Sequence, residues 1–225
     1  MGKPRALNLA ALRGYGVART LFAPTSLARA IDKLGFVQAD PIRAPARAQD
    51  LTLRHRVRNY CARDLERLYP KLSIEEDFFI NYGFVPHATH ALMHPRIARK
   101  QWSKSRQAKA NAVLEFVRGR GATHPRDVDA HFQHGKVRNW FGGSTNASTQ
   151  LLDEMHYRGL LRIAGRQGGI RLYAARAHTQ SDGDPQQSLD ALVDVIVRKY
   201  APTIARALAL GAREQASQWH AAMGG

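Results

Sequence analysis

The order of apolar patterns within residues 101–178 restricts the fold of this chain more than any other feature. Apolar residues recur at helical spacing from Ala110 to Val117, which predicts a first helix. Pro125, after a glycine break, is typical of the first turn of a second, short helix. An apolar face from Leu151 to Met155 predicts a third helix. Alternating residues on both sides of Gly168-Gly169 then predict a two-stranded hairpin.

Three helices followed by a basic hairpin are the element order of a winged helix, a helix-turn-helix variant with a β wing. In such a module the third helix enters the major groove with its N-terminal residues toward the bases. Arginines in the wing suit phosphate or minor-groove contacts. The predicted DNA-binding residues of this unit are therefore Ser144, Thr145, Asn146 and Thr149 at the helix start, and Arg162, Arg166 and Arg171 in the hairpin. Two alternatives stay open: a protein–protein role for the module, and a simple capping role for the polar helix start.

The charge balance favours the same partner. The chain has 34 Lys and Arg against 18 Asp and Glu, a formal net charge of +16, so a polyanion is the natural partner class. An anionic membrane is the rival, but no basic amphipathic segment or acylation signal accompanies the charges. No apolar run approaches a bilayer span and no signal core follows the N-terminus, so we expect a cytoplasmic protein. The single cysteine, Cys61, excludes an intramolecular disulfide and is expected to pack.

Residues 1–100 are predicted to form a first module of similar kind. Helical spacing predicts a helix from Thr25 to Leu34, ended by Gly35. The segment Phe36–Asp40 changes period and stands before a proline, which predicts an extended stretch. We expect a further helical region over Leu51–Leu68. The run Ile80–Pro95, rich in aromatics, His, Gly and Pro, is predicted to be irregular.

Residues 179–225 are predicted to hold only part of a third module. After a polar linker, an apolar stripe from Leu189 to Tyr200 predicts a helix that ends at Pro202. The alanine-rich remainder is too short for a complete module. The predicted fold class is therefore mainly α with short β-hairpins (α+β), arranged as tandem winged-helix modules with the third one incomplete.

Gln38 and Asp40 are the residues that best suit chemistry. They stand two apart in the extended stretch, so both side chains are expected on one face of the backbone. Such a pair can hold a water between a carboxylate and an amide. Hydrolysis of a glycosidic bond needs a carboxylate that stabilises the oxocarbenium ion and accepts the proton of the attacking water. Polar pairs at strand ends more often cap turns, which is the alternative.

The stretch from Leu34 to Ile42, followed by Arg47, resembles the signature of the YcaQ/AlkZ family of bacterial DNA glycosylases. That family has a Gln-x-Asp or Gln-x-Gln motif after a leucine-glycine helix end, with an arginine a few residues on. Gln38 and Asp40 match the two polar positions. Further similar stretches are Arg158–Leu161, Gly168–Tyr173 and Leu192–Pro202, so the resemblance covers most of residues 20–202.

The resemblance implies a monofunctional glycosylase that removes bulky alkylated purines from DNA, including N7-alkylguanine and interstrand crosslinks. It implies that Asp40 activates the water and stabilises charge, that Gln38 orients the water, and that Arg47 supports Asp40 or binds a phosphate. Arg43 and Arg54 complete the predicted DNA-binding set. Double-stranded DNA is the expected partner of a monomer, with no metal, cofactor or Schiff-base lysine. The alternative class is a non-enzymatic winged-helix DNA-binding protein such as a transcription regulator.

The chain departs from the family pattern in two places. Family members continue into a complete third module and a β-rich C-terminal region, so we expect elements that close around DNA to be absent and activity to be weakened or lost. The run Asn81–His87 also differs from the family's usual Tyr-Trp-x-His-Glu. The role of that run is left open.

His87, His90 and His94 form a His-x2-His-x3-His array that would suit zinc if it were helical. Pro86 and Pro95 bracket it, and no thiolate or nearby acid is evident in the sequence. We expect a DNA-facing loop here and no metal site.

Overall fold

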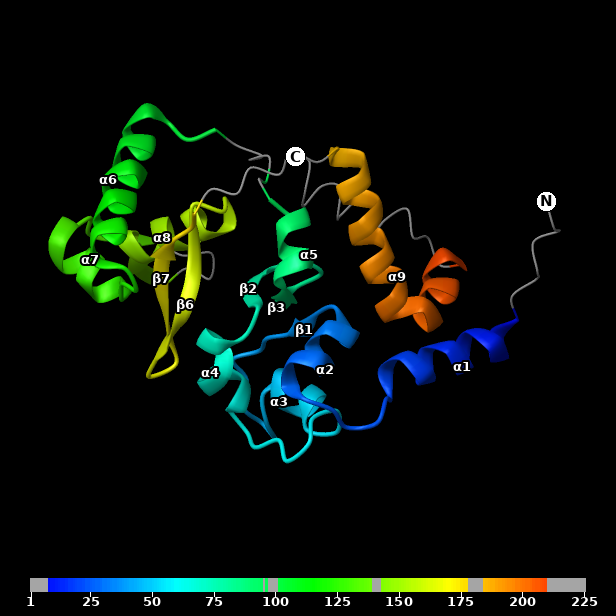
Figure 1. The fold of residues 1–225 in the computed structure, drawn as a ribbon. Coiled ribbons are helices and arrows are strands. Elements are labelled where there is room, and N and C mark those ends of the chain that lie inside the picture. Colours follow the sequence, from blue (N-terminus) through cyan, green and yellow to red (C-terminus); the bar gives the residue numbers. More distant parts are fainter. Residues whose placement is uncertain (1–7, 95, 97–100, 139–142, 178–183, 210–225) are drawn as a thin grey trace.

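The computed structural model describes residues 8–94, 96, 101–138, 143–177 and 184–209. About half of them are helical, and the strands form three small antiparallel sheets (Figure 1). This mixed α+β content agrees with the predicted fold class. Among the helices of the described ranges, none is both long and apolar enough to cross a membrane.

The N-terminal part of the chain surrounds a three-stranded sheet in the order β1-β3-β2. Its elements are α1 (Leu9–Thr20), α2 (Leu27–Leu34), β1 (Val37–Gln38), α3 (Ala48–Leu53), α4 (Asp64–Leu68), a 3-10 turn (Tyr69–Lys71), β2 (Ile74–Phe78), β3 (Tyr82–Pro86) and α5 (His87–Leu92). Helix α2 is confirmed with its caps, because the Ser26 hydroxyl accepts the N–H of Arg29 and Gly35 is left-handed at φ 67°.

Two expectations for this part were wrong. The run Ile80–Pro95 is not irregular, since it contains β3 and all of α5. Gly83 makes the strand possible: a side-chain carbon there would lie 2.4 Å from the carbonyl oxygen of Val37 in the paired strand. The helical region over Leu51–Leu68 is in fact the end of α3 and the separate α4, with turns between them.

The next part confirms the predicted order of three helices and a hairpin. Its elements are α6 (Lys104–Arg120), α7 (Pro125–Phe132), β4 (Lys136–Arg138), β5 (Ser144–Asn146), α8 (Ala147–Tyr157), β6 (Leu161–Gln167) and β7 (Ile170–Ala175). The hairpin turns at Gly168 and Gly169, with φ values of 59° and 87° that glycine adopts without strain. One correction concerns Ser144–Asn146, which form a strand paired with β4 and not the first turn of the third helix.

One hydrophobic core joins these two parts. The same cluster of buried residues contains Leu27, Leu53 and Phe84 from the first part and Val113 and Tyr173 from the second. A buried hydrogen bond also links them, from the hydroxyl of Tyr69 to the carbonyl oxygen of Ile163 at 2.8 Å. The units predicted on either side of residue 101 therefore pack as one body.

The last described element, α9 (Pro185–Ala209), lies against α1 and α5 (Figure 1). Its Leu192 belongs to a second buried cluster with Phe36, Phe79 and Met93. The predicted end at Pro202 was wrong, because the helix continues to Ala209. An internal proline removes one helical hydrogen bond and can kink a helix, but it does not have to end the helix.

Candidate active site

The backbone around Asp40 is held in place by its neighbours. Beyond β1 the chain stays paired, since the N–H of Ala39 donates to the carbonyl oxygen of Tyr82 at 2.9 Å. The N–H of Asp40 donates to Oε1 of the buried Gln49 at 3.1 Å. Oδ1 of Asp40 accepts the N–H of Ile42 at 2.8 Å. One carboxylate oxygen therefore caps a turn, and no hydrogen bond from the described residues reaches the other.

Asp40 opens into a cavity of about 270 Å³. The cavity is lined by Ala39, Asp40, Pro41, Arg43, Arg47, Gln49, Glu66, Tyr82, Arg166, Gly168, Gly169 and Arg171. It therefore lies between the segment after β1 and the tip of the β6–β7 hairpin. A half-buried carboxylate surrounded by arginines is suited to a substrate that carries both a developing positive charge and phosphates.

The structure does not bring Gln38 into this cavity. Gln38 pairs with Gly83 in the sheet, its side chain is exposed, and it is not among the lining residues. The carboxamide that does contact Asp40 belongs to Gln49. Sequence reasoning missed Gln49 because its link to Asp40 runs through the fold and not through motif spacing.

Arg47 lines the cavity, but its side chain is mostly buried and does not pair with Asp40. It forms an ion pair with Glu66, and both side chains are about nine-tenths buried. Burial lowers the pKa of Arg47, and the nearby charges of Arg43 and Arg166 lower it further. Of the two roles that the resemblance implied for Arg47, support of Asp40 is thus replaced by an ion pair with α4.

The hairpin arginines also have protein partners. β2 carries the longest acidic run of the sequence, and its Glu75 and Glu76 are buried. Arg162 pairs with Glu75 at 2.9 Å, and Arg166 pairs with Glu76. Arg171 lies 3.7 Å from Glu76 and 3.1 Å from Asp153. These three arginines therefore fasten the hairpin to β2. The run of acids in a basic chain was the sequence signal that could have revealed this.

Tyr82 lines the Asp40 cavity and contacts Phe78, which lines a different cavity. Its ring lines the Asp40 cavity, with the guanidinium of Arg171 at 4.2 Å from the ring centre. The ring of Tyr82 also packs edge-to-face against that of Phe78, with 4.7 Å between the ring centres. Phe78 lines a larger cavity of about 830 Å³, which also contains Trp102 and Tyr157. The other residues that line the larger cavity are polar or charged.

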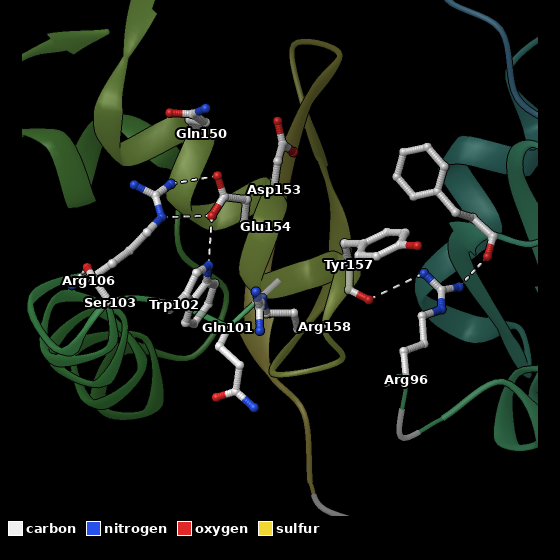
Figure 2. Close-up of a pocket in the computed structure, with 11 residues that line it drawn as sticks. Arg96, Gln101, Trp102, Ser103, Arg106, Gln150, Asp153, Glu154, Tyr157 and Arg158 are labelled. Atoms are coloured by element: carbon white, nitrogen blue, oxygen red, sulfur yellow. Dashed lines mark hydrogen bonds and ion pairs between the residues drawn. The ribbon is translucent and has the colours of Figure 1, made fainter. Parts of the chain in front are cut away.

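Figure 2 shows this larger cavity, with Glu154 of α8 held between two residues that precede or begin α6. Arg106 donates to both oxygens of Glu154, at 2.8 and 2.6 Å, and the indole N–H of Trp102 donates at 3.0 Å. The middle of α8 is therefore covered on this face and carries carboxylates. Only its first turn, near Thr149, keeps the polar character expected of a DNA-reading helix.

The other predicted contacts of the α8 start are partly occupied. Asn146 donates to Asp129 at 2.9 Å, which ties β5 to α7. Ser144 is exposed and Thr145 is half-buried. Arg54, at the end of α3, is exposed, as is Arg43 beside Asp40.

The histidine array is helical at His87 and His90, but it does not gather its three rings. Nε2 of His90 and Nε2 of His94 lie 2.9 and 2.8 Å from the same oxygen of buried Asp77, while His87 turns to Glu75. Donors on one tetrahedral zinc lie roughly 3.3 Å apart, so these separations fit hydrogen bonds better. The segment is not a DNA-facing loop. His90 and His94 are buried supports of β2.

Burial alone would raise the pKa of Asp77, but the hydrogen bonds from His90 and His94 and the charge of Arg96 outweigh it. The pKa of Asp77 is thereby held well below its usual range. For His94 burial wins over the attraction of Asp77 and lowers its pKa to about 4. His94 is therefore neutral near pH 7.

A comparison with protein families gives a match to one family, described as DNA glycosylase AlkZ-like, over residues 31–224. The chain belongs to the AlkZ-like DNA glycosylase family. The matched range contains Asp40 and every residue that lines its cavity. No curated protein and no solved structure matches the chain. Family membership makes DNA the substrate polymer and agrees with the resemblance found in the sequence.

Proposed function

We propose that this protein is a monofunctional DNA glycosylase that hydrolyses the N-glycosidic bond of alkylated purines, N7-alkylguanine foremost, in double-stranded DNA. The observation that carries the proposal is the half-buried carboxylate of Asp40, which opens into an arginine-lined cavity within the family match. Interstrand crosslinks through N7 of guanine belong to the same substrate class.

In the proposed reaction a water bound at the second oxygen of Asp40 attacks C1′ of the sugar, and its proton passes to the carboxylate. The C1′–N9 bond breaks and its electron pair goes to the purine. An N7-alkylated purine already carries a positive charge, so it leaves neutral and needs little further activation. The negative charge of Asp40 stabilises the oxocarbenium character that develops on the sugar.

Gln38 and Gln49 have different proposed roles. Gln49 accepts a hydrogen bond from the backbone N–H of Asp40 and is a positioning residue. Gln38 lies two residues before Asp40 and is exposed, so a bound nucleotide can contact it. We propose that Gln38 orients the water from the side of the bound nucleotide.

The lining of the Asp40 cavity supports a monofunctional reaction. A bifunctional glycosylase needs an amine to form a Schiff base with the sugar. The residues that line the cavity include arginines and no lysine. A water molecule is therefore the proposed nucleophile.

We propose that a protein monomer binds DNA across the surface that carries Asp40, Arg43 and Arg54. The units would be winged-helix modules at 1–100 and 101–178, and a partial third one at 179–225. In this arrangement the first turn of α8 and the exposed residues of β5 approach the duplex. The hairpin arginines add positive potential while they hold β2.

The direct test is incubation with duplex DNA that carries N7-alkylguanine, followed by detection of abasic sites. We expect Asp40→Asn to reduce base release at least about 100-fold, because the acceptor of the water proton is lost, with DNA affinity nearly unchanged. The exposed Asp32→Asn of α2 is the matched control and should keep full activity. DNA binding without base release by the unaltered protein would favour the transcription-regulator class instead.

A further inference from the structure

Arg63 is the non-glycine residue with the largest positive φ among the described residues. Its φ is 75° and its ψ is 3°, in the left-handed region that a long side chain rarely adopts. Two contacts hold it there: buried Asp50 accepts the N–H of Arg63 at 3.0 Å and the hydroxyl of Tyr60 at 2.8 Å. Strained residues held in this way concentrate at functional sites.

The side chain of Arg63 points to solvent, although its backbone is held firmly. It is 71% exposed, and its Nε lies 3.7 Å from Glu66, beyond hydrogen-bond distance. Glu66 already pairs with buried Arg47. Asp64, the other carboxylate nearby, pairs with Arg67 at 2.8 Å. The ion pair between Arg63 and Glu66 is therefore long and open to solvent on the arginine side, which leaves the guanidinium of Arg63 accessible to a further anion.

Arg63 lines a cavity of about 390 Å³ that adjoins the Asp40 cavity. The two share Glu66, Arg166, Gly168 and Gly169. The charge of Arg63 is also close enough to lower the pKa of Arg47, after larger effects of burial and other arginines. The cavity that Arg63 lines therefore lies next to the cavity that Asp40 lines.

We propose that Arg63 and this cavity form a binding site for a backbone phosphate of the DNA strand that places its sugar at Asp40. The site rests on the proposed function. An arginine guanidinium binds phosphate through two parallel hydrogen bonds. Because Asp50 fixes the backbone of Arg63, the guanidinium is already oriented toward the bound strand before DNA binds. In this proposal the backbone strain is offset by phosphate binding.

The left-handed backbone of Arg63 allows a test in which the side chain is removed without a loss of stability. Glycine adopts a left-handed conformation freely, so Arg63→Gly removes the guanidinium while relieving the backbone. We expect its melting temperature not to fall, while its affinity for undamaged duplex DNA drops about three- to tenfold. The slope of log affinity against log salt should become shallower by about 0.9, the contribution of one phosphate. Arg63→Lys, which keeps the charge but not the paired hydrogen bonds, should keep the salt slope and recover only part of the affinity.

Arg118→Gln is the matched control, because it removes one charge from an exposed ion pair on α6. If Arg63→Gly binds with the affinity and salt slope of the unaltered protein, or if Arg118→Gln weakens binding equally, the phosphate site is refuted. Loss of affinity in Arg63→Gly without any base release by the unaltered protein would keep the phosphate site and reject the glycosylase. Base release that depends on Asp40 but not on Arg63 would do the reverse.

Discussion

Asp40 depends on residues outside the motif that first draws attention to it. Its N–H is paired with Gln49, and one of its carboxylate oxygens is occupied by the N–H of Ile42. The turn-capping alternative and the catalytic one are therefore compatible, because a carboxylate has two oxygens. One oxygen orients the group, and the other accepts no hydrogen bond from the described residues.

Gln49→Ala should separate positioning from water orientation. It removes the acceptor for the N–H of Asp40, so the carboxylate loses alignment and kcat should fall about tenfold while KM changes little. The free energy of unfolding should also fall by about 1 kcal/mol, since a hydrogen bond is lost. Gln38→Ala should reduce kcat with no loss of stability. Single-turnover kinetics and denaturant unfolding of both variants check this, and equal effects on stability would contradict the assignment.

At the scale of elements, β2 connects the β6–β7 hairpin to the rest of the chain. Glu75 and Glu76 pair with arginines of the hairpin, and Asp77 binds His90 and His94. Without these ion pairs we expect the hairpin to be mobile; with them it is held beside the Asp40 cavity. The glycine tip lines that cavity because the ion pairs keep it there.

Glu76→Gln should destabilise the protein strongly. The Glu76 side chain is 1% exposed, and the substitution leaves the charges of Arg166 and Arg171 without their shared partner. Breaking a buried pair in this way costs about 3 kcal/mol of unfolding free energy. Glu115→Gln, at an exposed pair on α6, should change stability little. Urea denaturation of the two variants gives the comparison, and similar midpoints would show that Glu76 does not hold the hairpin.

For the whole molecule, the shared core implies that the two parts unfold together. Leu53 and Val113, from different parts, belong to one buried cluster, and His94 binds Asp77 of β2. Neither part keeps a complete core by itself. A single cooperative transition is therefore expected for residues 8–177, in spite of the modular element order.

The stability of this body should fall as the pH falls below about 6.5. Burial lowers the pKa of His94 to about 4 from 6.5, so between these values the unfolded chain binds the proton and the folded chain does not. The linked loss of unfolding free energy is about 3 kcal/mol. Below about pH 4, protonation of Asp77, whose pKa is also lowered, removes further stability. Thermal unfolding from pH 8 to pH 4 should show this fall, and a flat profile would exclude it; His94→Gln should show a shallower slope.

Much of the fold can be predicted from the sequence because the sequence patterns that determine it are local. The caps of α2, the apolar face of α6 and the glycine pair of the hairpin each act within a few neighbouring residues. The motif that contains Asp40 is local as well, so residue spacing and family resemblance are enough to single it out as a candidate site.

Only the tertiary structure decided which residues surround that motif. Arg166 and Glu76 are ninety positions apart, and the contacts of Gln49 and of α9 with the segment around Asp40 likewise depend on packing. The sequence determined a basic chain with a hairpin and with the carboxylate, Asp40, that we propose as the catalytic group. Packing turned the hairpin arginines inward, because buried carboxylates require partners, and left Arg63 exposed beside the cavity.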